Sequence, residues 1–223
     1  MWKGVGLTVV LVAAVGVPDL RAQTAPSADS KPGWEIEAYV GGARHSPVGR
    51  HLGLTPDRNH LFIGLHLSRS IVDWGWGRFA YAPDIVPLLI VTNNPYFRER
   101  PILTPVGSVG ATVETGSGPV AGCAASPIGF ETTVRLASHL KVYGGGAAGI
   151  VWFTRDVPVT DSRAFNYTFE FGGGLQWQFS GRRFLRVGYK FHHLSNAYTA
   201  RANPGVDGNV FMIGMGLALG HVR

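Results

Sequence analysis

The sequence has one cysteine, few charged residues and, beyond its N-terminal segment, no long apolar run. Because Cys123 is the only cysteine, an internal disulfide and a thiolate metal cluster are both excluded. Charged residues make up only 15% of the chain, compared with about 25% in an average soluble domain. No apolar run after residue 22 is long enough for a membrane-spanning helix.

The N-terminus has the pattern of an export signal. Met1-Trp2-Lys3 is a short basic start, residues 4–17 are almost wholly apolar, and Ala22 is a small residue suited to cleavage. We therefore expect a signal peptide over residues 1–22, the alternative being a soluble N-terminal helix. Residues 23–33 are small, polar and proline-bearing, which predicts a flexible leader. Residues 34–223 then form a single domain.

The net charge is +6. A nucleic-acid-binding protein can be basic, but it is not usually exported or so apolar, so we expect no nucleic-acid partner. A cationic exported protein meets anionic lipid phosphates instead, which favours a membrane partner.

Apolar residues alternate with polar or small ones, most clearly over residues 165–180. The odd positions there are aromatic or aliphatic except for Gly173, and the even positions are polar or glycine. Strand side chains alternate faces, so this segment predicts a strand with two unlike faces. A strand of a soluble sandwich is usually about 5–6 residues long. The greater length favours a membrane barrel with lipid outside and a polar interior.

The same alternation predicts seven further strands, one of them irregular. They lie at residues 34–40, 61–68, 78–86 (the irregular one), 128–136, 140–153, 185–191 and 211–219. Long connections at 45–58, 93–126, 155–164 and 197–206 alternate with short turns, and Cys123 falls in the second of them. We therefore predict an all-β fold, an eight-stranded antiparallel transmembrane β-barrel of the bacterial outer membrane with both termini in the periplasm. A soluble exported barrel or sandwich is the alternative, because the chain does not end in an aromatic residue.

His193 and Ser195 are two apart and share a strand face, with Cα atoms about 6.6 Å apart. A serine with a base in reach and an acid to orient that base is the minimal apparatus for acyl transfer. By parity both residues continue the outward, lipid-facing stripe, and Asp207 shares that face if the last strand extends back from residue 211 to reach it. Asp207 then opposes Ser195 or reaches His193, depending on a register that the sequence leaves open. The group is either a catalytic site for a lipid of the outer leaflet or an ordinary set of loop-edge residues.

A metal site is not expected. His192 and His193 are adjacent on a strand and so point to opposite faces, which prevents them from binding one ion together. His45, His51, His60 and His66 are interpreted as loop or lumen residues. No cofactor is predicted.

The stretch from Val187 to Ala197, followed by Asn203–Asp207, resembles the lipid A 3-O-deacylase (PagL) family. That family has an eight-stranded outer-membrane barrel and the pattern His-x-Ser-Asn-Ala, then a short loop and a glutamate. The resemblance implies that His193 is the base, Ser195 the nucleophile and Asn196 part of the oxyanion site. Asp207 stands where the glutamate would be, with a side chain one methylene shorter.

The resemblance further implies a substrate and a partner. They are lipid A of lipopolysaccharide in the outer leaflet, whose ester at position 3 would be hydrolysed. Two alternatives stay open: a non-catalytic structural or binding barrel whose site has decayed, and a phospholipase or general esterase with the same triad. The sequence predicts neither the acyl-chain length nor the oligomeric state.

Overall fold

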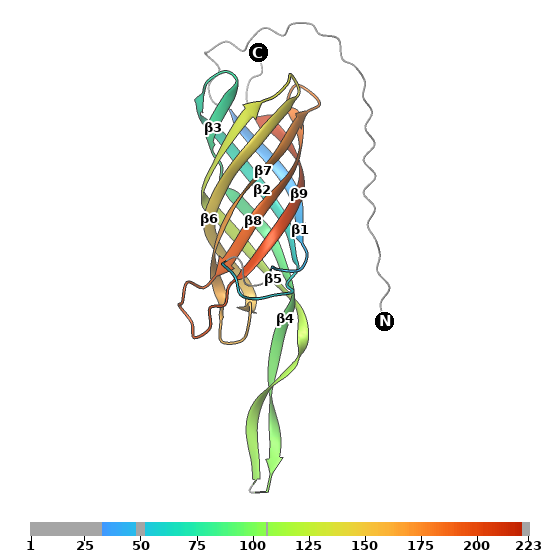
Figure 1. Cartoon of the computed structure of the whole chain (residues 1–223), viewed down its shortest axis with the longest axis vertical. Coiled ribbons are helices and arrows are strands. Elements are labelled where there is room, and N and C mark those ends of the chain that lie inside the picture. The colour runs from blue at the N-terminus through green and yellow to red at the C-terminus, as the bar shows by residue number, and fades with distance from the viewer. Residues whose placement is uncertain (1–32, 48–51, 106, 220–223) are drawn as a thin grey trace, which may run out of the picture.

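The computed structural model describes residues 33–47, 52–105 and 107–219. They form nine antiparallel strands that close into a barrel (Figure 1). The strands are β1 (Trp34–Ala43), β2 (His60–Asp73), β3 (Gly77–Tyr81), β4 (Asp84–Thr104), β5 (Gly107–Arg135), β6 (Leu140–Val157), β7 (Arg163–Gln178), β8 (Arg183–Ser195) and β9 (Val206–Leu219). The expected signal peptide, residues 1–22, lies outside the described residues, as does all of the leader except Gly33. In the described part of the chain, no helix is long and apolar enough to cross a membrane.

The barrel closes between its first and last strands, because β1 pairs with β9 as well as with β2. β3 and β4 lie end to end and together fill one place in the barrel wall, since both pair with β2 and both pair with β5. Pro83, which has no N–H to donate, separates them. Its carbonyl still accepts a hydrogen bond from the Leu67 N–H at 3.0 Å, so the ladder continues across the break. Eight positions in the wall result, as predicted; the irregular strand expected at 78–86 is in fact this junction.

The predicted alternation of faces is confirmed in β7 and β8. Phe171 and Trp177 point outward and are more than half exposed, whereas the residues directly before them, Glu170 and Gln176, are buried inside the barrel. In water such a wall would leave many large apolar side chains exposed. In a membrane they face lipid, which is the arrangement of outer-membrane barrels.

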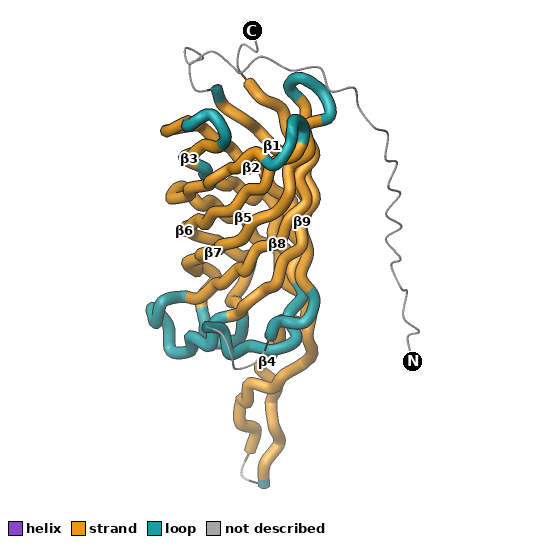
Figure 2. Tube along the Cα trace, turned by 45° about the horizontal axis from the view of Figure 1, so that its top comes forward, coloured by secondary structure: helices purple, strands orange, loops and turns teal. Residues whose placement is uncertain are grey.

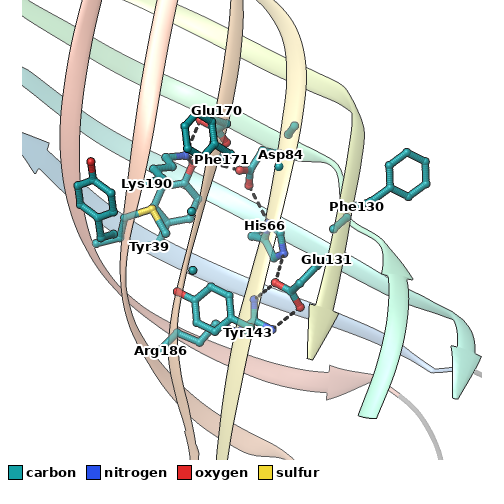
Figure 3. Close-up of a pocket in the computed structure, with 18 of the residues that line it drawn as sticks. Tyr39, His66, Asp84, Phe130, Glu131, Tyr143, Glu170, Phe171, Arg186 and Lys190 are labelled. Atoms are coloured by element: carbon teal, nitrogen blue, oxygen red, sulfur yellow. Dashed lines mark hydrogen bonds and ion pairs between the residues drawn. The ribbon is translucent and has the colours of Figure 1, made fainter. Parts of the chain in front are cut away.

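The interior is filled by paired charges (Figure 3). Arg186 donates two hydrogen bonds to Glu131, at 2.8 and 2.9 Å, and the Lys190 ammonium lies 2.8 Å from Glu170. Buried ions are costly unless each has a partner, and these pairs meet that requirement. The other ionisable side chains of this network are Glu35, Glu37, His66, Arg78 and Asp84.

Glycines make room for this filling. A Cβ at Gly214 would lie 2.0 Å from Glu37 Oε1, and a Cβ at Gly216 would lie 2.1 Å from the Phe184 ring. The polar interior therefore depends on positions without a side chain in the wall.

The prediction of a long loop at residues 93–126 is wrong. β4 and β5 keep pairing from Asn94 opposite Gly118 to Thr104 opposite Gly107, so the connection is a long β-hairpin. Cys123 accordingly lies in β5, opposite Trp152 of β6, and not in a loop. Figures 1 and 2 show the hairpin projecting well beyond the barrel. It leaves the same end as the β1–β2, β6–β7 and β8–β9 connections, which we call the loop end; the other is the turn end.

Candidate active site at the loop end of the barrel

His193 and Asp207 face each other directly across β8 and β9 near the loop end. His193 Nδ1 lies 2.6 Å from Asp207 Oδ1. An ionised carboxylate can only accept a hydrogen bond, so it fixes the proton of the neutral imidazole on Nδ1. Nε2 then remains unprotonated, the form that a general base needs. The structure thus decides the register that the sequence left open: Asp207 opposes His193, not Ser195. Direct opposition lets the shorter side chain reach the ring.

Ser195 is the last residue of β8 and shares the outer face with His193. Ser195 lies opposite Tyr167 of β7, and His193 lies opposite Phe169. The serine is therefore two residues closer to the loop end than the histidine. Ser195 is half-buried. Its hydroxyl makes no hydrogen bond to any described residue, so the expected contact with His193 is not formed in this state. Such bonds are often long in free enzymes and tighten when substrate is bound.

An aromatic surface adjoins His193 on the membrane side. The His193 ring lies 5.5 Å, centroid to centroid, from Phe169, which in turn contacts Phe171 and Phe191. Phe171 is 55% exposed on the outer wall. The imidazole therefore stands at the edge of an apolar surface where a lipid acyl chain can lie.

Asn196 is fully buried and ties the β8–β9 loop together. Its backbone N–H donates to Asn203 Oδ1 at 2.9 Å, and its Nδ2 donates to the Ala202 carbonyl at 2.7 Å. Two of its three N–H protons are thus engaged within the loop. The next two residues, Ala197 and Tyr198, have left-handed φ values of 51° and 60°. The predicted oxyanion role of Asn196 stays a prediction.

The inner side of the wall behind this site is closed by two histidines. His192 points inward, donating to or accepting from Thr168 Oγ1 at 2.7 Å, and its ring lies 5.9 Å from that of His60. His192 and His193 thus point to opposite faces, as expected. Of the predicted loop or lumen histidines, His60 and His66 lie in the interior and His45 lies in a loop, while His51 is outside the described residues. Among the residues that the structure describes, no group of three or more histidine, cysteine or acidic side chains could hold a metal.

One residue of the site could not be found from the sequence. The Gly53 N–H, from the β1–β2 connection, donates to Asp207 Oδ2 at 2.9 Å. The two residues are 154 positions apart, and no local motif marks the glycine. Only barrel closure through β1 and β9 brings the first connection beside the last one.

Comparison with known proteins identifies the fold and the family of the chain. The model of the lipid A 3-O-deacylase (PagL) family matches residues 106–216, a range that holds all four candidate site residues. The crystal structure of the outer-membrane enzyme PagL is 15% identical, with a TM-score of 0.53, over 81% of this chain and 97% of that one.

This chain belongs to the PagL family of outer-membrane barrels. The crystal structure of Neisserial surface protein A (NspA) is also similar, at 12% identity and a TM-score of 0.50, over 82% of this chain and 96% of that one. These likenesses show the barrel fold. The family match further indicates a hydrolase that acts on lipid A. No curated protein sequence matches the chain. The Gly53 segment lies outside the range that the family model matches.

Proposed function

We propose that this PagL-family barrel is a serine esterase that removes the 3-O-linked acyl chain from lipid A in the outer leaflet. The observation that carries the proposal is the 2.6 Å contact between His193 Nδ1 and Asp207 Oδ1 on the outer wall, beside Ser195. It holds the imidazole in the tautomer that can accept a proton from a serine. The loop end then lies outside the cell, and both termini are periplasmic.

In the proposed reaction His193 Nε2 takes the Ser195 hydroxyl proton as Oγ attacks the ester carbonyl carbon. The tetrahedral oxyanion is stabilised by N–H groups of the Asn196 turn. The carbon–oxygen bond to the sugar breaks, and protonated His193 gives its proton to the departing 3-oxygen. Water, activated by the same imidazole, then hydrolyses the acyl-enzyme and releases a fatty acid. Asp207 stabilises the imidazolium in both halves.

The position of the site suits a substrate that stays in the membrane. His193 adjoins Phe169, which contacts the exposed ring of Phe171 on the outer wall. An acyl chain packed on these rings would bring its ester to the level of the imidazole, at the rim where headgroups begin. A soluble ester would gain little from that surface.

Mass spectrometry of lipid A tests the proposal directly. Cells expressing the wild-type chain should show lipid A that has lost one 3-O-acyl group, and cells expressing Ser195→Ala should not. Ser180→Ala, an exposed serine in the β7–β8 turn at the opposite end, is the matched control and should behave as wild type. Heat-modifiable migration on gels verifies that each variant folds.

Intact lipid A with a correctly folded wild type would overturn the substrate assignment. A serine-reactive fluorophosphonate then separates the alternatives. Labelling of Ser195 without lipid A turnover favours a phospholipase or general esterase, to be resolved by competition between phospholipid and lipopolysaccharide. Absence of labelling favours a non-catalytic barrel.

A further inference from the structure

Residues 52–55 form a short extended segment that lies against the β8–β9 loop, and we call it the strap. The Leu54 N–H donates to the Pro204 carbonyl at 2.6 Å, and the Thr55 N–H donates to the Gly205 carbonyl at 3.3 Å. The Thr55 hydroxyl donates to the same Gly205 carbonyl at 2.6 Å. The strap is thus fastened to the segment that leads directly into Asp207.

The two faces of the strap differ. Gly53 and Thr55 are buried, while Leu52 and Leu54 are 59% and 63% exposed. The buried face lies so close to β9 that a Cβ at Gly53 would be 2.7 Å from the Asp207 backbone nitrogen. Only glycine allows this approach, which brings the Gly53 N–H to the carboxylate.

Asp207 has both of its oxygens engaged. Oδ1 meets His193 Nδ1 at 2.6 Å and Oδ2 accepts from the Gly53 N–H at 2.9 Å. With the strap in place the carboxylate is fully buried, so the Gly53 N–H supplies the hydrogen bond that Oδ2 would otherwise take from water. A carboxylate held at both oxygens is also fixed in its rotation, and that rotation sets the direction of the bond to His193.

We propose that Gly53 and Thr55 of the strap are positioning residues of the active site, acting through Asp207. The strap fixes the shorter acid of this chain in the orientation that the imidazole needs. The proposal rests on the proposed function in taking Asp207 as the orienting acid. It couples the first connection of the barrel to the reaction, although neither residue touches the reacting atoms.

Thr55→Val and Thr55→Ser test the proposal as a pair. Valine keeps the size of the side chain and removes the hydrogen bond to the Gly205 carbonyl, while serine keeps the bond. We expect Thr55→Val to lower kcat about five- to tenfold with KM unchanged, as the loss of one buried hydrogen bond implies. Thr55→Ser should retain most of the activity. Asp57→Asn, an exposed position of the same connection, is the control and should match wild type.

A double-mutant cycle shows whether the strap acts through the acid. If it does, Thr55→Val has no further effect on kcat in an Asp207→Asn background, because the carboxylate that it positions is gone. An undiminished five- to tenfold loss in that background would overturn the proposal, and so would an unchanged kcat in Thr55→Val alone.

Proton NMR of the barrel in detergent micelles gives a second readout that needs no substrate. The His193 Nδ1 proton should exchange with solvent several-fold faster in Thr55→Val than in wild type and Thr55→Ser. Equal exchange in all three overturns the strap proposal. If the wild type leaves lipid A intact and the Nδ1 proton still exchanges faster in Thr55→Val, the strap proposal is supported and only the proposed function is refuted.

Discussion

Replacing Asp207 by the glutamate of the family pattern should impair this site, not improve it. In this structure the acid directly opposes His193, with 2.6 Å between Oδ1 and Nδ1, and Gly53 closes the space on its other side. The added methylene lengthens the side chain by about 1.5 Å. Because Asp207 is fully buried, that length must displace the strap or the imidazole.

The expected size of the effect follows from overpacking. Inserting one methylene into a filled site costs about 1–3 kcal/mol. Where this strain is relieved by turning the imidazole away, the catalytic orientation must be restored in the transition state, which at 1.36 kcal/mol per factor of ten is about 5- to 150-fold in kcat/KM. Asp207→Asn should be more damaging and lower kcat about 10⁴-fold, as the same change from aspartate to asparagine does in a serine-protease triad. An amide has one acceptor oxygen for two donors, the His193 Nδ1–H and the Gly53 N–H, so one of them must face the amide nitrogen.

The assay is release of fatty acid from purified lipid A in detergent micelles, with product measured by mass spectrometry. Heat-modifiable migration verifies that each variant is folded. Activity of Asp207→Glu equal to or above that of wild type would refute the reasoning. It would mean that the aspartate is too short and that the strap does not define the space around it.

Three further predictions concern the barrel. Arg186→Met should lower the free energy of unfolding by about 3–5 kcal/mol, because it removes the buried cation that donates two hydrogen bonds to Glu131 and lies 3.3 Å from Glu37. Urea unfolding in micelles, with the outward Met215→Leu as control, measures this, and an equal midpoint would contradict the role given to the ion pair. Replacing residues 95–117 by a two-residue turn should leave folding and lipid A deacylation intact, because beyond Asn94 the described parts of β4 and β5 pair only with each other. Loss of heat-modifiable migration would contradict this. Chelation with EDTA should leave the deacylation rate unchanged, since the described residues offer no group of three metal ligands, and a rate restored only by added metal would contradict that.

Much of the barrel was predictable from the sequence because the alternation of side chains between lipid and lumen is visible within each strand. A strand between lipid and a polar lumen must alternate its side chains, so the segment at 165–180 shows its two faces in the sequence itself. The prediction was wrong where the rule does not apply. The β4–β5 hairpin extends beyond the barrel wall, so the rule that links alternation to lipid and lumen does not apply there, and its pairing is visible only in three dimensions.

The candidate site divides in the same way. The sequence alone determined that His193 and Ser195 share the outer face, because two residues on a strand are related by its period of two. It also determined that Asp207 follows one loop later. The tertiary structure decided which residue the acid meets, because register depends on how β8 and β9 pair over their whole length. It alone decided that Gly53 completes the site, because closing the barrel brings together segments that lie 154 residues apart.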